Sequence, residues 1–276
     1  MSKSSRELYT CGCSFTAKDW VITDANRMEG YETGPHPMWP EILAGRLDLE
    51  PVNMACPGMG NDYILSTSMK YILDNHENIE LVAIQWSQLT RMWVLDIPDY
   101  GYFNPSVWLN EEDRVHDRWG PDFVGFPYIF GDPWTASRKL MTYVLRNPDR
   151  FLVLYKKYLR EVSTLQTLCE KLGVNYIFGQ GFEAHQAEKW LHLNSNIDMD
   201  RVLREFIQLP DFDKIDREKF MGWPCVLELG GTTMTDGLPD FDPHKNRMNP
   251  IDNHPSAHGQ HLIADQFYNK YKQLYG

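Results

Sequence analysis

Residues 80–86 read ELVAIQW, a nearly continuous apolar run. Its length and its Val and Ile content favour a strand buried on both faces, as the strands of a parallel sheet are. Working outward from it, we expect shorter strands at residues 6–11, 51–55, 174–178 and 225–229. Segments with helical periodicity separate them, at residues 38–47, from Asn61 or Asp62 onward, at 151–172, at 185–209 and after Ser256. Strands that alternate with helices predict an α/β three-layer sandwich with a mostly parallel central sheet.

The region of residues 98–134 breaks this alternation. It holds many aromatic side chains punctuated by Gly and Pro, and no helical or strand period persists in it. Linkers lack such aromatic density, so we interpret residues 96–147 as an aromatic-rich insertion or cap within one domain that spans residues 1–276. The insertion is either a structural cap with its own small core or the wall of a substrate site, where aromatic faces suit sugar rings and acyl chains alike. Residues 235–250 are polar and rich in Asp and Pro, and we expect a loop there.

Composition excludes several classes of protein. The chain has 27 Lys and Arg residues against 38 Asp and Glu residues, and it contains no basic run that would follow a phosphate backbone, which disfavours nucleic-acid binding through overall charge. Five cysteines are an odd number and argue against a disulfide scaffold. The sequence contains no apolar stretch of ~18 residues, the length that a membrane span needs, so we predict no membrane span. The N-terminus does not resemble a signal peptide, so the expected address is the cytoplasm, although a virion or a signal-independent export route would leave the same features. The oligomeric state stays open.

Polar loops follow the strands that are expected to end near Cys11, Ala55 and Trp86. The carboxyl ends of parallel strands lie along one edge of the sheet, so these loops should converge there, and the loop with Asp252 and His254 should join them.

A serine hydroxyl at the first of these loops, on Ser14, is a weak nucleophile until a base takes its proton. His254 is the strong candidate base, and Asp252 can hold one nitrogen of its ring and stabilise the imidazolium. Negative charge that develops on a substrate carbonyl needs fixed donors, and the backbone N–H groups of Ser14 and Gly58 are candidates, with a side-chain donor from the loop after residue 86.

The sequence here resembles the SGNH (GDSL-type) hydrolases, as a divergent member. The matching pieces occur in the family's order: GCSFT at residues 12–16, WPEIL at 39–43, NMACPG at 53–58, IQWS at 84–87 and DNHP at 252–255. The resemblance implies a flavodoxin-like SGNH hydrolase fold. It also implies that Ser14 is the nucleophile, His254 the base, Asp252 its partner and Gly58 an oxyanion donor.

Three departures from the family pattern bear on the site. Cys13 stands where the family has Asp, and we expect it to pack beneath the turn that carries Ser14. Ser87 stands where the family's Asn donates to the oxyanion. Ser87 is a shorter donor, and Gln85, Gln88 or Asn61 are substitutes for it.

The third departure lies in the last block. Asp252 and His254 are two residues apart instead of three, so Asp252 meets the ring from a different angle or another carboxylate, such as Asp236 or Asp242, serves in its place. His258 and His261 share a helical spacing with His254, but Pro255 and Gly259 interrupt it, and we predict no metal site.

The leading hypothesis is a serine esterase that hydrolyses a small ester, an O-acetyl or other acyl group on a carbohydrate, and needs no cofactor. The alternative is a non-catalytic protein on a hydrolase scaffold that binds a glycan or a partner protein. A third interpretation is a lipase-like or phospholipase-like activity. It would act through Arg91 and the aromatic wall. For any of these activities Arg91 is a candidate to bind a carboxylate or phosphate on the substrate, although such an Arg is more often a surface or salt-bridged residue.

Overall fold

The structure is a computed structural model of the whole chain. It describes residues 6–18, 27–32, 34–89, 91, 96–97, 101–102, 148–182, 198–238, 240, 242–250 and 252–276. Most of the predicted insertion at residues 96–147 lies outside them, as do residues 183–197 of the expected helix at 185–209.

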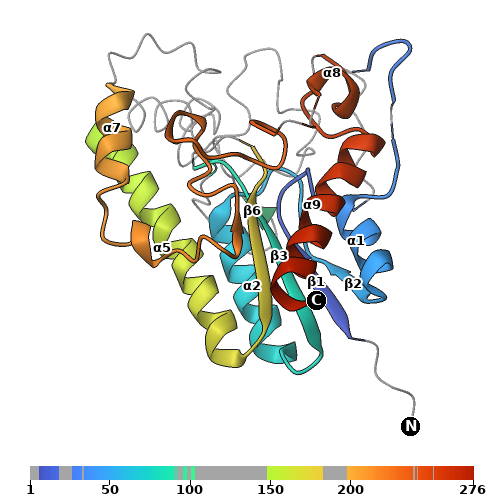
Figure 1. Cartoon of the computed structure of the whole chain (residues 1–276), viewed down its shortest axis with the longest axis horizontal. Coiled ribbons are helices and arrows are strands. Elements are labelled where there is room, and N and C mark those ends of the chain that lie inside the picture. Colours follow the sequence, from blue (N-terminus) through green and yellow to red (C-terminus); the bar gives the residue numbers. More distant parts are fainter. Residues whose placement is uncertain are drawn as a thin grey trace.

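In the described part of the chain, five parallel strands form the central sheet, in the order β2-β1-β3-β6-β7 (Figure 1). Their bounds are β1 Glu7–Cys11, β2 Glu50–Asn53, β3 Ile79–Trp86, β6 Asn175–Gln180 and β7 Phe220–Met221. The chain adds β2 on one side of β1 and then β3 on the other, so the direction of strand addition reverses at β1. Ligand sites of open α/β sheets lie at the carboxyl ends of the strands beside such a reversal.

Helices cover both faces of this sheet. The helices α2 (Asn61–Asn75) and α5 (Pro148–Leu172) pack on one face, and α1 (Trp39–Leu47) and α9 (Ala257–Tyr275) pack on the other (Figure 1). Alternate strand residues point to opposite faces, so Val82 belongs to the first core and Leu81 to the second. This arrangement confirms the three-layer α/β sandwich.

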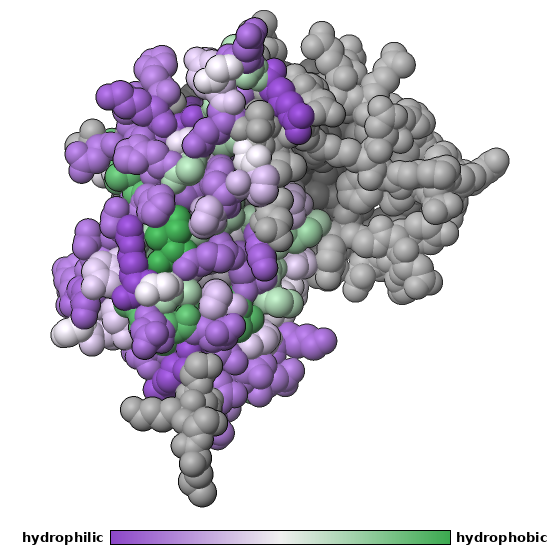
Figure 2. Space-filling view, turned by 90° about the vertical axis from the view of Figure 1, so that its right-hand side faces the viewer, coloured by the Kyte–Doolittle hydropathy of each residue, from purple (hydrophilic) through white to green (hydrophobic). Residues whose placement is uncertain are grey.

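The packing between α1 and α9 centres on two aromatic rings. Trp39 and Phe267 are fully buried and stack with 4.4 Å between ring centroids. Figure 2 views the molecule from the side on which α1 and β2 lie, and the described surface there is mainly hydrophilic with small hydrophobic areas. The two helices therefore turn their apolar side chains inward. Among the helices that the structure describes, none is both long enough and apolar enough to cross a membrane.

The expected strand at residues 225–229 is wrong. The fifth strand is β7, which pairs with Phe178 and Gly179 of β6. Cys225 has a φ of 63°, in the left-handed region, and its N–H donates to the carbonyl of Gly222 at 2.8 Å. A backbone that turns in this way cannot extend a sheet ladder, and the chain after it forms a 3₁₀ helix, η5 (Leu227–Leu229).

Two further expectations need correction. Residues 235–250 are not wholly a loop, since they contain the short helix α8 (Pro243–Asn246), capped by the carboxylate of Asp242. The N-cap of α2 is Gly60, not Asn61 or Asp62, because the Asn61 side chain turns instead to the loop after β3. Ser256 does cap α9, and its hydroxyl accepts a hydrogen bond from the N–H of Gly259 at 3.2 Å.

Several short elements also occur among the described residues. The strands β4 (Asp96–Ile97) and β5 (Gly101–Tyr102) pair antiparallel within the segment predicted as an insertion. The helices α7 (Met199–Phe206) and η4 (Phe212–Lys214) follow later in the chain.

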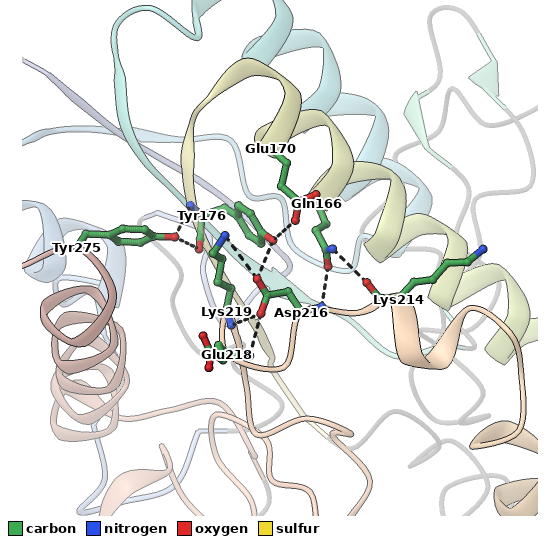
Figure 3. A network of polar contacts seen from close by, with 8 residues as sticks. All are labelled: Gln166, Glu170, Tyr176, Lys214, Asp216, Glu218, Lys219 and Tyr275. Carbon is green, nitrogen blue, oxygen red and sulfur yellow. Dashed lines mark hydrogen bonds and ion pairs between the residues drawn. The ribbon is translucent and has the colours of Figure 1, made fainter.

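A polar network fastens the segment after η4 to the amino end of β6 (Figure 3). The Tyr176 hydroxyl donates to Glu170 on α5 at 2.8 Å, and Gln166 on α5 accepts from the backbone N–H of Asp216 at 2.9 Å. Tyr275 of α9 donates to the Tyr176 carbonyl at 3.0 Å. Because this network lies at the amino end of β6, it holds the layers together at the end of that strand away from its carboxyl-terminal loop.

Candidate active site

The first polar loop begins where β1 ends. The carbonyl of Cys13 accepts hydrogen bonds from the N–H groups of Thr16 at 2.9 Å and Ala17 at 3.0 Å, so the chain closes one tight turn directly after the strand. Ser14 lies in this turn and is 6% exposed. The turn therefore presents a nearly buried hydroxyl at the carboxyl edge of the sheet.

Gln85 of β3 supports this turn from below. Its side-chain carbonyl accepts from the Thr16 hydroxyl at 2.7 Å and from the N–H of Cys13 at 3.4 Å, while its amide donates to the carbonyl of Trp86 at 3.0 Å. A Cβ atom on Gly181 would lie 1.9 Å from the Gln85 amide nitrogen, so a glycine is needed there. Gln85 is thus a support for the Ser14 turn in this structure.

Cys13, which stands where the family has Asp, packs as an apolar residue. It is fully buried and forms a small cluster with Phe15 and Phe182. Its neighbour in sequence on β1, Cys11, is also buried, and burial raises the pKa of the Cys11 thiol to about 12. The Cys11 thiol is therefore a poor nucleophile and a poor metal ligand. In the described part of the chain, no three His, Cys, Asp or Glu side chains are placed to hold a metal ion.

His254 connects the turn to the last loop of the chain. Its Nε2 atom lies 2.7 Å from the Ser14 hydroxyl oxygen, and its Nδ1 atom lies 2.5 Å from Oδ1 of Asp252. The Asp252 side chain is 3% exposed and that of His254 is 25% exposed. A carboxylate at Nδ1 favours the tautomer with its proton on that atom, so that Nε2 is unprotonated and can accept the proton of Ser14.

A local turn accommodates the short spacing between these two residues. Oδ1 of Asp252 accepts from the backbone N–H of His254 at 2.9 Å as well as meeting its ring. The N–H of Asp252 in turn donates to the side chain of Asn249 at 2.8 Å. Asp236 instead pairs with Arg247, at 2.6 Å. Of the carboxylates considered from the sequence, Asp252 is the one that meets the ring.

The loop after β3 is held by amide groups. The N–H of Ser87 donates to Oδ1 of Asn61 at 2.7 Å, and the Asn61 amide donates back to the Ser87 carbonyl at 3.2 Å. Gln180 of β6 donates to the same carbonyl at 2.9 Å. The Ser87 hydroxyl accepts from Nη1 of Arg91 at 3.3 Å. Gln88, in the same loop, is half-buried.

Gly58 lies in the loop after β2. The turn from Cys56 to Met59 is closed by a hydrogen bond of 3.3 Å, and Gly58 has a φ of 80°, which its lack of a side chain permits. The N–H of Cys56 also donates to the carbonyl of Gly12 at 3.2 Å, and so ties this loop to the start of the Ser14 turn. The three loops expected to converge therefore do so.

A series of contacts between aromatic rings leads from Arg91 to His254. The guanidinium carbon of Arg91 lies 4.7 Å from the centroid of Phe182, whose ring lies 4.9 Å from Phe15, which in turn lies 5.0 Å from His254. The Nε atom of Arg91 is buried and has no hydrogen-bond partner among the described residues. Sequence reasoning singled out Arg91 but had no signal for Phe182, which lies beyond the end of β6.

Two other residues of the site escaped sequence reasoning. Gln180 acts on Ser87, 93 positions away, and no local pattern indicates that contact. Asn249 accepts from the N–H of Asp252, three residues later, in a segment for which the sequence predicts only a loop. The strand ends and the motif blocks indicate which loops meet, but not which side chains support those loops.

No model of a known protein family matches the chain, and no curated protein sequence matches it. Similar solved structures include a catalytic mutant of Axe2, an acetylxylan esterase from Geobacillus stearothermophilus, with 13% identity and a TM-score of 0.42 over 98% of this chain and 96% of that one. TesA has 13% identity and a TM-score of 0.43, over 98% and 99% of the two chains. A carbohydrate esterase, whose active site displays divergent catalytic and non-catalytic binding functions, has 15% identity and a TM-score of 0.44, over 100% and 67%.

Proposed function

We propose that this chain is a serine hydrolase of the SGNH type that cleaves a carboxylic ester. The observation that carries the proposal is the continuous hydrogen-bonded line from the Ser14 hydroxyl through the His254 ring to the Asp252 carboxylate, with separations of 2.7 and 2.5 Å. A hydroxyl, an imidazole and a buried carboxylate in this order are the parts of an activated nucleophile.

In the proposed reaction, the Ser14 oxygen attacks the carbonyl carbon of the ester while Nε2 of His254 takes its proton. The tetrahedral intermediate expels the alcohol, which receives that proton from His254, and an acyl group remains on Ser14. Water then attacks the acyl carbon while Nε2 of His254 takes a proton from it. The second tetrahedral intermediate breaks its bond to the Ser14 oxygen, which receives that proton, and the acid is freed. Asp252 holds the ring and stabilises the imidazolium that forms in each half.

The oxyanion is assigned to donors on the three converging loops. They are the backbone N–H groups of Ser14 and Gly58, together with a polar group near Ser87. The Ser87 hydroxyl accepts a hydrogen bond from Arg91, so its own hydrogen points away from the Arg91 side chain. Asn61 already spends its carbonyl oxygen and one N–H on the backbone of Ser87. Loss of one oxyanion donor costs about 10²–10³ in rate, so we expect slow turnover if only the two backbone groups serve.

The proposed substrate is a small O-acyl ester, with acetyl on a carbohydrate as the first choice. This choice rests on the aromatic residues of 98–134, whose flat faces suit sugar rings. Arg91 adds a proposed contact for a carboxylate or phosphate on the substrate, supported by its buried Nε atom without a partner among the described residues. If Arg91 has this role, Arg91→Ala raises KM for an anionic ester and leaves KM for a neutral ester unchanged.

Hydrolysis of p-nitrophenyl acetate and butyrate by the wild type and by Ser14→Ala tests the proposed function. We expect release of p-nitrophenol by the wild type and near-background release by Ser14→Ala. Thr10→Ala is a control of similar size, since Thr10 is buried on β1 and its hydroxyl bonds the carbonyl of Val52 at 3.4 Å. Equal rates for wild type and Ser14→Ala remove Ser14 from the reaction.

A second candidate is a non-catalytic protein that keeps the scaffold and binds a glycan or a partner protein. Ser87, at the position of the family's Asn, favours it, because that position offers a hydroxyl that accepts from Arg91 in place of an amide donor. Isothermal titration with acetylated xylo-oligosaccharides separates the candidates. Binding without turnover supports the second, and turnover that Ser14→Ala abolishes supports the first.

A further inference from the structure

The backbone of residues 246–256 folds back on itself around the loop with His254. The N–H of Met248 donates to the His254 carbonyl at 2.8 Å, and the N–H of Ser256 donates to the Asn246 carbonyl at 2.9 Å. Between them, Arg247 and Pro255 form an isolated antiparallel bridge. Arg247 is therefore directly opposite the residue that follows His254.

The Arg247 side chain joins two loops. Its Nη1 atom donates to the side-chain carbonyl of Asn253 at 2.8 Å, and its Nη2 atom lies 2.6 Å from Oδ1 of Asp236. Asn253 stands between Asp252 and His254 in the sequence. The Arg247 and Asp236 side chains are 19% and 20% exposed, so the pair is largely withdrawn from water.

Hydrogen bonds to Thr233 hold Asp236 in place. Its second carboxylate oxygen accepts from the Thr233 hydroxyl at 3.1 Å, and its N–H donates back to the same hydroxyl at 2.8 Å. The neighbouring Thr235 hydroxyl lies 3.2 Å from the carbonyl of Gly181, directly beyond β6. Arg247 thus connects the acid–base loop, through Asp236, to the carboxyl end of a central strand.

We propose that Arg247 is a positioning residue for the pair of Asp252 and His254, an inference that rests on the proposed function. A guanidinium offers several donors at fixed angles, so it can hold Asn253 and Asp236 at once and fix the rotation of the two-residue turn. The turn needs this brace because a catalytic imidazole must be held within about 0.5 Å of its productive place.

Steady-state kinetics of Arg247 variants on p-nitrophenyl acetate give the first test. For Arg247→Ala we expect kcat to fall about 10- to 100-fold while KM stays near the wild-type value, as a small misplacement of a reacting group does. Arg247→Lys keeps the positive charge but loses the two fixed donors of the guanidinium, so its kcat should lie between the values of the wild type and Arg247→Ala. Added guanidinium ion should restore part of the lost kcat in Arg247→Ala. Lys245→Ala is the matched control, since Lys245 is exposed on α8 and lies 4.0 Å from Asp242.

Proton NMR gives a readout that does not depend on turnover. The hydrogen between Nδ1 of His254 and Asp252 should resonate far downfield in the wild type, and it should shift or broaden in Arg247→Ala. Asn253→Ala covers the case in which Arg247→Ala does not fold, because it removes only the acceptor and leaves the pair of Arg247 and Asp236 intact. We expect the same NMR change there, in smaller degree.

The proposal is overturned if folded Arg247→Ala or Asn253→Ala keeps both the wild-type kcat and the wild-type resonance. Failure of the proposed function looks different: Ser14→Ala would then hydrolyse the ester as fast as the wild type. Even in that event the NMR comparison decides the role of Arg247. An altered resonance supports it, and an unaltered one rejects it.

Discussion

The shortest contact in the candidate site depends on one oxygen atom. Oδ1 of Asp252 contacts both the ring and the backbone N–H of His254. These two contacts let Asp252 reach the ring although the two residues are one position closer in sequence than in the family pattern. Sequence reasoning identified both residues but left the partner of the ring open, because the angle of a side chain across a two-residue turn depends on atoms that spacing does not encode. The roles of Gln85 and Arg247 stayed hidden for a similar reason. Gln85 bonds Thr16, 69 positions away, and Arg247 bonds Asn253 and Asp236 across two loops whose paths the sequence does not indicate.

Asp252→Asn should retain the fold and lose most activity. An amide can still accept from the N–H of His254, but it cannot stabilise the imidazolium and can favour the wrong tautomer, so we expect kcat to fall by about 10³–10⁴. Asp242→Asn is the control, because Asp242 caps α8 and lies 4.0 Å from the exposed Lys245. Ester hydrolysis with both variants checks this, and a kcat for Asp252→Asn within a factor of three or so of the control would contradict it.

Two glycine substitutions separate the support of the Ser14 turn from general effects of an added methyl group. Gly181→Ala places a carbon 1.9 Å from the Gln85 amide nitrogen, so Gln85 must move and release its contacts with Thr16 and Cys13. We expect a loss of about 1–3 kcal/mol in the free energy of unfolding, because buried polar groups lose their partners.

Gly45→Ala, in α1, has nothing within 4 Å of the new carbon and should gain about 0.5–1 kcal/mol. Urea denaturation measures both values. If the two variants shift stability in the same direction by the same amount, Gln85 does not brace the turn as described.

At the scale of elements, periodicity predicted the long pieces well. The apolar run at 80–86 forms most of β3, and the segment with helical periodicity at 151–172 forms most of α5. The short apolar stretch at 225–229 misled, because an apolar segment that packs into the core as a turn has the same composition as a buried strand. Only the backbone conformation of Cys225 distinguishes the two.

The contact between α2 and α5 carries a pH-dependent charge. Lys157 of α5 lies 2.5 Å from Asp62 of α2 and 2.5 Å from Glu161. Burial, with a further contribution from Asp62, raises the pKa of Glu161 to about 7 against the opposing effect of Lys157. The folded chain therefore keeps a proton on Glu161 over a pH range in which the unfolded chain has released it.

Stability should fall as the pH rises from about 4.5 to about 7, by at most about 1.4 kcal/mol per pH unit from this one group. Glu161→Gln removes the ionisation, so its stability relative to the wild type should increase between pH 5 and pH 8. Glu205→Gln, which alters an exposed pair with Arg201, is the control and should show no such trend. Unfolding curves at both pH values check this, and a constant difference between Glu161→Gln and the wild type would contradict it.

At the scale of the molecule, the parallel sheet brings the site together. Ser14 and His254 are 240 positions apart, yet the turn after β1 and the loop before α9 place them within hydrogen-bond distance. This meeting could be anticipated from the sequence, because strand order along one edge determines which loops converge. The aromatic segment could not be treated in the same way, since it has no period to follow, and its role in substrate choice stays a prediction.

The central claim is that His254 activates the Ser14 hydroxyl, and the rate of labelling by a fluorophosphonate tests it most directly. Peptide mass spectrometry should find the label on Ser14 of the wild type, and His254→Ala should react at least about 100-fold more slowly, because the hydroxyl is a weak nucleophile without its base. An unlabelled Ser14 in the folded wild type, or equal labelling rates for the two proteins, would contradict the account.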